Sequence, residues 1–228
     1  MSERVGGRMT EGEGRVWTDY VGFLACLGLV ALIVSTPGEM GVLLLPPVLY
    51  ELAVAVTFLV RGRARRTLAG VGPRVAAYTA GFMVPIFVRV AVEWRPEWLA
   101  ATPSPVLRNV GGGLWLAGLV IGFWPVWYLR RSFSIEPAAR ELVATGPYLF
   151  ARHPIYAAHL VGYTGSLLLH ATVPFALVML VWFVVLRIRI GYEERVLTEA
   201  FPEYAFYRRR VGAFGPRLAR LVTAPERA

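Results

Sequence analysis

The sequence has little charge, no lysine and almost no cysteine. Only 17% of its 228 residues are charged, whereas 56% are hydrophobic. So few charges cannot cover the surface of a water-soluble domain of this size, and so hydrophobic a chain is not disordered. The single cysteine, Cys26, excludes a disulfide scaffold. These absences leave a protein with several membrane helices.

Short motifs of several enzyme classes are also missing. The sequence has no Walker A loop, no HExxH, no CxxC and no GxSxG. Phosphate-loop, zinc and serine-hydrolase chemistry therefore have no support, and no metal is expected. We interpret the three glycines at 111–113 as a site of close helix packing and not as a nucleotide loop.

The charge that is present is mostly positive. All 24 basic residues are arginines, against 15 acidic residues, and the net charge is +9. The arginines stand in clusters between apolar stretches and not along one polar face, which favours membrane topology over nucleic-acid binding. With the clusters at 61–66, 130–131 and 208–210 on one side, the positive-inside rule predicts a multi-pass protein of the cell inner membrane with both termini in the cytoplasm.

Six apolar stretches predict an all-α integral membrane protein. The expected membrane helices lie at about 17–35, 41–60, 75–92, 106–129, 154–169 and 173–186. The last two form a tight hairpin of short helices, since 16 residues reach about 24 Å against a hydrocarbon core of roughly 30 Å. Apolar residues at helical spacing from 193 to 207 predict amphipathic helices on the membrane surface or over a site. We divide the chain into N-terminal membrane helices, 1–130, and a catalytic unit facing the cytoplasm, 131–228.

The segment from 145 to 156, TGPYLFARHPIY, is the first candidate for a functional role. Gly146 and Pro147 make a turn, and Pro154 can stand in the first turn of the helix that follows. The helix N-terminus so formed attracts an anion such as a carboxylate. The alternative is an interfacial turn in which Arg152 extends toward the lipid headgroups.

Two adjacent carboxylates and two arginines are the second candidate. Glu193 and Glu194 can bind the ammonium group of a cofactor or substrate, or alternatively complement a helix dipole and stay solvated. Arg187 and Arg189 are two residues apart on a helix, so at most one of them faces a site. A guanidinium at that depth suits a carboxylate or phosphate on a lipid-borne substrate.

Four further ionisable residues, Glu51, Arg89, His159 and His170, lie in or beside the predicted membrane helices. Such groups are functional candidates by their position alone. No partner is evident for any of them in the sequence.

The order of these features resembles that of the isoprenylcysteine carboxyl methyltransferases, a family related to the membrane phospholipid methyltransferases. The resemblance covers about residues 130–216 and combines an RHPxY element with an EExxL element some forty residues later. The matching residues are Leu142, Val143, Gly146, Pro147, Tyr148, Arg152, His153, Pro154, Ile155, Tyr156, Glu193, Glu194, Leu197, Phe201, Tyr204, Tyr207, Arg210 and Val211.

This resemblance implies a methyltransferase that uses S-adenosylmethionine on the cytoplasmic side. The implied cofactor-binding residues are Leu142, Val143 and Tyr148 around the adenine and ribose, His153, Pro154, Ile155 and Tyr156 completing the pocket, and Glu193, with Glu194 beside it, at the α-amino group. Arg189 would orient the carboxylate of the acceptor. Arg140 and Glu141 stand where the eukaryotic carboxyl methyltransferases have a different polar pair. The acceptor would be a lipophilic or prenylated molecule from the bilayer, and no nucleic-acid partner is expected.

The implied reaction is an in-line displacement at a sulfonium methyl group, which requires proximity and a dry pocket. A carboxylate acceptor is nucleophilic at pH 7 without a general base, whereas an ammonium acceptor must first lose a proton. The sequence offers no clear general base for an ammonium acceptor, and His153 is the nearest candidate. It therefore favours a carboxylate acceptor.

Two alternatives stay open. A membrane sterol-type reductase has a similar RHPxY-like element and uses NADPH, but the EExxL element argues against it. A non-enzymatic membrane protein such as a transporter is the other alternative; transporters typically contain an inverted repeat, and none stands out in the sequence.

Overall fold

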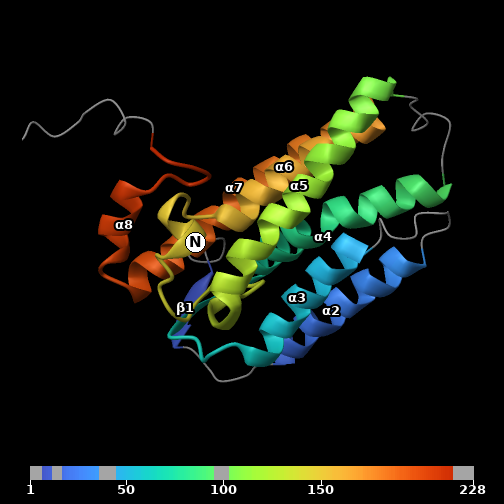
Figure 1. Cartoon of the computed structure of the whole chain (residues 1–228). Coiled ribbons are helices and arrows are strands. Elements are labelled where there is room, and N and C mark those ends of the chain that lie inside the picture. The colour runs from blue at the N-terminus through green and yellow to red at the C-terminus, as the bar shows by residue number, and fades with distance from the viewer. Residues whose placement is uncertain (1–6, 12–16, 36–44, 95–102, 218–228) are drawn as a thin grey trace, which may run out of the picture.

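The computed structural model describes residues 7–11, 17–35, 45–94 and 103–217, and the chain there is mostly helical (Figure 1). The helices are α2 (Trp17–Val34), α3 (Leu45–Val60), α4 (Val71–Trp94), α5 (Pro105–Leu129), α6 (Pro154–His170), α7 (Val173–Ala200) and the short α8 (Tyr204–Arg210). The six predicted long helices are thus present. The side chains of residues 17–19 and 89–94, Arg89 among them, lie outside the described part.

In the part of the chain that the structure describes, three helices contain stretches that are long and apolar enough to cross a membrane, at 71–88, 105–132 and 173–200. Two shorter apolar helices lie at 20–34 and 45–60. The number of six crossings, the cytoplasmic side of the termini and the division of the chain at residue 130 stay predictions.

The last long helix, α7, continues well beyond its predicted end. It runs without a break to Ala200, so residues 193–200 continue α7 and do not form a helix of their own, whereas the expected C-terminal helix is present as α8. Its 28 residues extend about 42 Å, which is longer than a hydrocarbon core of about 30 Å, and the polar residues from Glu193 onward stand at one end of the helix. An ion pair one turn apart, between Arg189 and Glu193, supports the polar part. The helix ends at Phe201, because the residue before a proline disfavours helical backbone.

Helices α6 and α7 form the predicted hairpin around Ala171 and Thr172. The Thr172 hydroxyl caps α7 by accepting a hydrogen bond from the backbone N–H of Phe175 at 3.4 Å. The two helices touch where the rings of Tyr163 and Trp182 meet edge to face, with centroids 4.8 Å apart. Along most of their length, however, α6 packs on α5 and α7 packs on α4.

Glycines let α5 and α6 approach each other closely. Gly118 lies against the backbone of Gly162, and a Cβ at Gly111 would come within 2.9 Å of the carbonyl oxygen of Gly165. Small residues at such positions are typical of close membrane helix pairs. The predicted packing role of the glycine triplet is confirmed for Gly111 and wrong for the next two glycines, which face open space.

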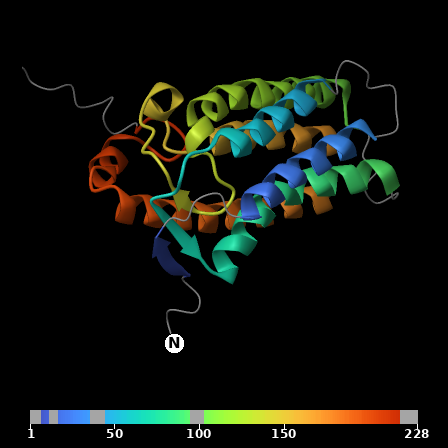
Figure 2. The same cartoon turned by 90° about the horizontal axis from the view of Figure 1, so that it is seen from below.

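A small antiparallel sheet is an addition to the predicted all-α fold. Its strands are β1 (Arg8–Glu11), β2 (Arg66–Ala69) and β3 (Ala138–Ala139), in that spatial order. Figure 2 shows the strands toward the same end of the bundle as α8. The sheet packs on the polar end of α7, and together they bury a second core of Leu68, Ala139, Val196, Phe201 and Tyr204. Strands of two to four residues are too short for an alternating pattern to be recognised in the sequence.

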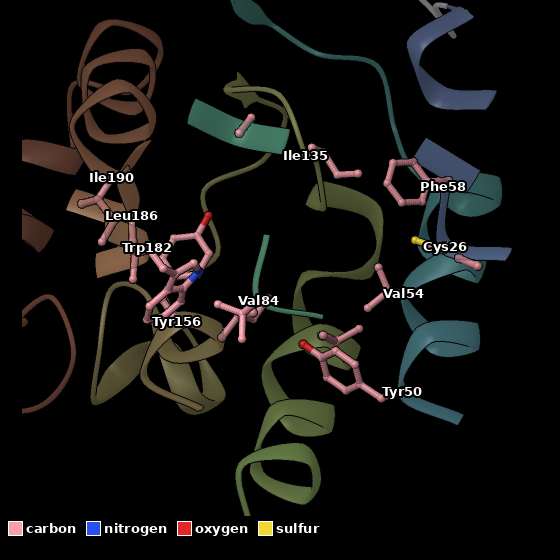
Figure 3. Packing of buried hydrophobic residues seen from close by; sticks show 14 of the residues in the cluster. Cys26, Tyr50, Val54, Phe58, Val84, Ile135, Tyr156, Trp182, Leu186 and Ile190 are labelled. Atoms are coloured by element: carbon pink, nitrogen blue, oxygen red, sulfur yellow. The ribbon is translucent and has the colours of Figure 1, made fainter. Parts of the chain in front are cut away.

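The main core lies between the helices. Figure 3 shows members of it from α2, α3, α4, α6 and α7: Cys26, Tyr50, Val54, Phe58, Val84, Tyr156, Trp182, Leu186 and Ile190. Trp182 is fully buried and donates a hydrogen bond from Nε1 to the carbonyl oxygen of Ala80 at 2.9 Å. This contact holds α7 on α4, and Arg189 lies seven residues further along α7, two turns toward the polar end.

Candidate functional site

A cavity of about 400 Å³ connects the interior of the helix bundle with its polar end. This volume lies within the range of small-molecule sites. In the bundle half the wall is largely apolar and includes Cys26, Leu29, Val54, Phe82, Val84, Trp115 and Leu119. At the polar end it contains nine of the ten predicted site residues: Leu142, Val143, Tyr148, His153, Pro154, Ile155, Tyr156, Arg189 and Glu193. Glu194 is the predicted residue that does not line the cavity.

The turn before α6 brings Tyr148 and His153 into the cavity wall. Gly146 begins this 3₁₀ turn, Gly146–Leu149, with a φ of 58°, and a Cβ there would collide with the ring of Tyr128. Only glycine therefore fits this position. The buried Tyr148 hydroxyl donates to the carbonyl oxygen of Pro125 at 3.4 Å, and burial raises the pKa of Tyr148 well above its ordinary value. His153 is the N-cap residue of α6, and Pro154 follows in the first turn as predicted.

Glu193 has one carboxylate oxygen held by the protein and one that is not. Its Oε1 accepts hydrogen bonds from Arg189 Nε at 3.0 Å and from the Tyr156 hydroxyl. Its Oε2 lies 3.7 Å from His153 Nδ1, which is too long for a hydrogen bond. The side chain is only 19% exposed. Among the described residues, Oε2 is thus an unfilled hydrogen-bond acceptor in a cavity wall.

Both oxygens of Glu194, in contrast, are filled. Oε1 accepts from Arg152 Nη2 at 2.7 Å and lies 3.1 Å from His153 Nε2, and Oε2 pairs with Arg208 Nε at 3.2 Å. Burial alone would raise the pKa of Glu194, but the hydrogen bonds and charges of His153 and Arg152 outweigh it and lower the pKa to about 2. Glu194 therefore ties α7 to the segment before α6 and to α8. The alternative of two solvated carboxylates at a helix start is wrong, because both lie far along α7 and are largely buried.

Arg152 holds the C-terminal segment over the polar end of the cavity. Its Nη1 donates to the carbonyl oxygen of Val211, and its backbone N–H donates to that of Gly212 at 2.8 Å. Because its side chain is only 8% exposed, the alternative in which it extends toward lipid headgroups is wrong. Nearby, the Tyr207 hydroxyl of α8 donates to the carbonyl oxygen of Tyr148 at 2.6 Å. Burial raises the pKa of Tyr207 to about 12, although Arg152 lowers it.

Arg189 faces the interior while Arg187 is exposed, as expected for residues two apart on a helix. Besides the bond to Glu193, Arg189 donates from Nη1 to the carbonyl oxygen of Ala77 and from Nη2 to that of Ile135, both at 3.0 Å. Three of its five N–H groups therefore bind the protein itself. The orientation of an acceptor carboxylate by Arg189 stays a prediction. Two of its N–H groups remain for such a contact.

Arg140 lines the cavity but was not among the predicted site residues. It is 6% exposed and lies two residues before Leu142, directly after β3. Its Nη1 donates to the carbonyl oxygen of Gly62, whereas its buried Nε has no hydrogen-bond partner among the described residues. Burial lowers the pKa of Arg140 from its ordinary value. The signal in the sequence was a charged residue at the point where the chain departs from the family pattern.

The remaining ionisable candidates divide into cavity and packing residues. Glu51 and His159 line the bundle half of the cavity, and His159 Nε2 shares a hydrogen bond with the Tyr50 hydroxyl at 3.0 Å. His170 Nδ1 lies 2.7 Å from the carbonyl oxygen of Ser166 at the end of α6, outside the cavity wall. Within the described ranges, no three or more His, Cys, Asp and Glu side chains are grouped so that they could hold a metal ion.

Comparison with known proteins agrees with the resemblance in the sequence. Residues 107–204, from α5 to the start of α8, match the family model described as phospholipid methyltransferase. This match confirms the resemblance to the isoprenylcysteine and phospholipid methyltransferase-like family over these residues. No solved structure matches the chain.

Two curated relatives have names that refer to metal resistance. Over 129 residues the chain is 31% identical to the nickel-cobalt-cadmium resistance protein NccN of Alcaligenes xylosoxydans xylosoxydans. Over the same length it is 39% identical to the cobalt-zinc-cadmium resistance protein CzcN of Cupriavidus metallidurans. Each alignment covers 56% of this chain and 56% or 55% of the relative. The chain therefore spans about half the length of the curated relatives it matches.

Proposed function

We propose, from the match of residues 107–204 to the phospholipid methyltransferase family, that the protein transfers a methyl group from S-adenosylmethionine to a carboxylate on a lipophilic acceptor. One observation carries the proposal. The unfilled Oε2 of Glu193 lies in the wall of a cavity that continues into the apolar interior of the helix bundle. A polar donor and a lipophilic acceptor can thus meet in one cavity, each in an environment that suits it.

The residues at the polar end fit S-adenosylmethionine. Arg189 and Tyr156 hold Oε1 of Glu193, so that the carboxylate is fixed and Oε2 can accept a hydrogen bond from an α-ammonium group. Leu142 and Val143 offer an apolar wall for an adenine ring. When bound, S-adenosylmethionine supplies a methyl group activated by its sulfonium.

The chain's own contribution to the transfer is orientation and the exclusion of water. A carboxylic acid with an ordinary pKa near 4 is ionised at pH 7, and the protein need not remove a proton from it. The bonds from Tyr207 to Tyr148 and from Arg152 to the carbonyl oxygen of Val211 tie α8 and the C-terminal segment to the turn before α6 at the polar end of the cavity.

Calorimetric titration with S-adenosylmethionine tests the donor assignment. Purified wild-type protein should bind, and Glu193→Gln should weaken binding by about 10- to 100-fold, because it removes a charge-assisted hydrogen bond. The matched control is Glu199→Gln on the same helix, whose side chain is 44% exposed and should leave the affinity unchanged. Absence of binding to the wild type would overturn the proposal. Tight NADPH binding in its place would favour the sterol-type reductase.

The acceptor is tested with membrane lipid extracts incubated with S-adenosylmethionine labelled in its methyl group. A carboxylate acceptor gives a methyl ester, from which alkali releases the label as methanol. Label that resists alkali would indicate N-methylation and refute the carboxylate. A protein that binds the donor but labels no extract would favour the non-enzymatic alternative.

A further inference from the structure

Three of the described arginines line the cavity, and they differ in whether they form an ion pair with a carboxylate of the protein. Arg152 pairs with Glu194 at 2.7 Å, and Arg189 pairs with Glu193 at 3.0 Å. Arg140 has no carboxylate partner among the described residues. It is thus the cavity-lining guanidinium whose positive charge the described protein leaves unbalanced.

The hydrogen bonds of Arg140 leave one edge of its guanidinium unused. Nη1 donates to the carbonyl oxygen of Gly62, while Nε is buried and has no acceptor, and Nη2 has none among the described residues. The N–H groups of Nε and Nη2 lie along the same edge of the planar guanidinium and match the two oxygens of a carboxylate. A guanidinium that is only 6% exposed and has no counter-ion costs free energy, and a bound anion would offset this cost.

Rigid elements fix the position of this side chain. Arg140 follows β3 directly, and Arg65 next to β2 donates its backbone N–H to the carbonyl oxygen of Ala139 at 2.6 Å. Gly62, its partner, donates its own N–H to the carbonyl oxygen of Arg131 at 2.9 Å. The small sheet therefore holds Arg140 at the polar end of the cavity instead of letting it extend into water.

We infer that Arg140 forms an anion subsite that binds a carboxylate at the polar end of the cavity. The carboxylate comes either from the methionine part of the methyl donor or from the acceptor. The inference rests on the proposed function for the identity of these ligands. It moves the recognition of a carboxylate from Arg189, which is largely occupied by the protein, to a guanidinium with a free edge.

Two pairs of probes distinguish the sources. The first pair is S-adenosylmethionine and decarboxylated S-adenosylmethionine, and the second is oleate and oleyl alcohol; each pair differs in the presence of a carboxylate. Binding is measured by calorimetry on detergent-solubilised full-length protein: wild type, Arg140→Gln, Arg140→Lys and Arg63→Gln. The last variant is the control, because it removes an exposed positive charge next to Gly62.

If the donor's carboxylate occupies the subsite, Arg140→Gln weakens binding of S-adenosylmethionine by about 10- to 100-fold. Decarboxylated S-adenosylmethionine then binds equally to the variant and the wild type. If the acceptor's carboxylate occupies it, the same loss is seen for oleate, with unchanged binding of oleyl alcohol and of S-adenosylmethionine. Arg140→Lys should lose part of the affinity in either case, since an ammonium cannot make the two-pronged contact.

Wild-type affinity of Arg140→Gln for both S-adenosylmethionine and oleate would overturn the inference. If that variant does not fold, Arg140→Lys decides, and wild-type affinity for both carboxylates in the lysine variant would overturn it as well. Failure of the proposed function has a different signature, which is a wild-type protein that does not bind S-adenosylmethionine. The oleate arm then still tests Arg140.

Discussion

Replacement of Glu194 by glutamine should destabilise the protein, because three donors converge on this carboxylate. The side chains of Arg152 and Glu194 are only 8% and 10% exposed. Loss of one partner of a buried ion pair costs about 3–5 kcal/mol. Arg152 keeps the carbonyl oxygens of Arg208 and Val211 as acceptors, so we expect the lower limit, about 3 kcal/mol. The side chain of Arg208 is 55% exposed and adds little.

Thermal unfolding in detergent, followed by circular dichroism, measures this loss. For a chain of this length, about 3 kcal/mol corresponds to a decrease in Tm of roughly 6–12 °C. Glu199→Gln is the control, because its exposed pair with Arg195 should contribute less than about 1 kcal/mol. In Glu194→Gln we also expect faster cleavage by trypsin at the arginines of α8, residues 208–210, which the carboxylate holds in place. Equal and small shifts of Tm in the two variants would refute the role of Glu194 as a structural link.

Three further predictions follow from single contacts. Gly118→Ala should lower stability by about 1–3 kcal/mol, because its Cβ would meet the backbone of α6, whereas Gly113→Ala has free space and should not; thermal unfolding of both variants checks this. Since Glu194 has a pKa of about 2 against an ordinary 4.5, its contribution is complete above pH 4.5 and is lost as the pH falls toward 2. Wild type should therefore lose more stability than Glu194→Gln in unfolding measurements over that pH interval. Tyr207→Phe removes the hydroxyl that binds the carbonyl oxygen of Tyr148, and calorimetry should show affinity for S-adenosylmethionine reduced about fivefold, or about 1 kcal/mol.

The helices could be predicted from the sequence because each apolar stretch is bounded by polar or charged residues. The end of α7 could not be placed, since apolar residues become fewer after Ile190 whereas the helix continues to Ala200. Proline at 202 was the better signal for the end. The sheet escaped prediction because its strands are short, and its pairing joins segments that are far apart in the chain.

The residues of the site could largely be predicted as a set, because the RHPxY and EExxL elements identify the two segments that lie together at the cavity. The role of each residue could not be predicted, since it depends on which of its polar atoms already form hydrogen bonds within the protein. Glu193 and Glu194 are neighbours in the sequence, but successive helix positions point about 100° apart. The Glu193 carboxylate therefore lies in the cavity wall beside Tyr156, whereas the Glu194 carboxylate pairs with Arg152 and does not line the cavity.

The same distinction applies to the arginines. Arg189 stands at the expected spacing from Glu193, yet two backbone carbonyls and that carboxylate take three of its five N–H groups. Arg140 stands at a position that departs from the family pattern, yet one edge of its guanidinium has no acceptor in the described protein. A carboxylate of a ligand can bind only to N–H groups that have no acceptor within the protein. Recognition of the ligand is therefore expected to depend more on Arg140, whereas Arg189 chiefly fixes the orientation of Glu193.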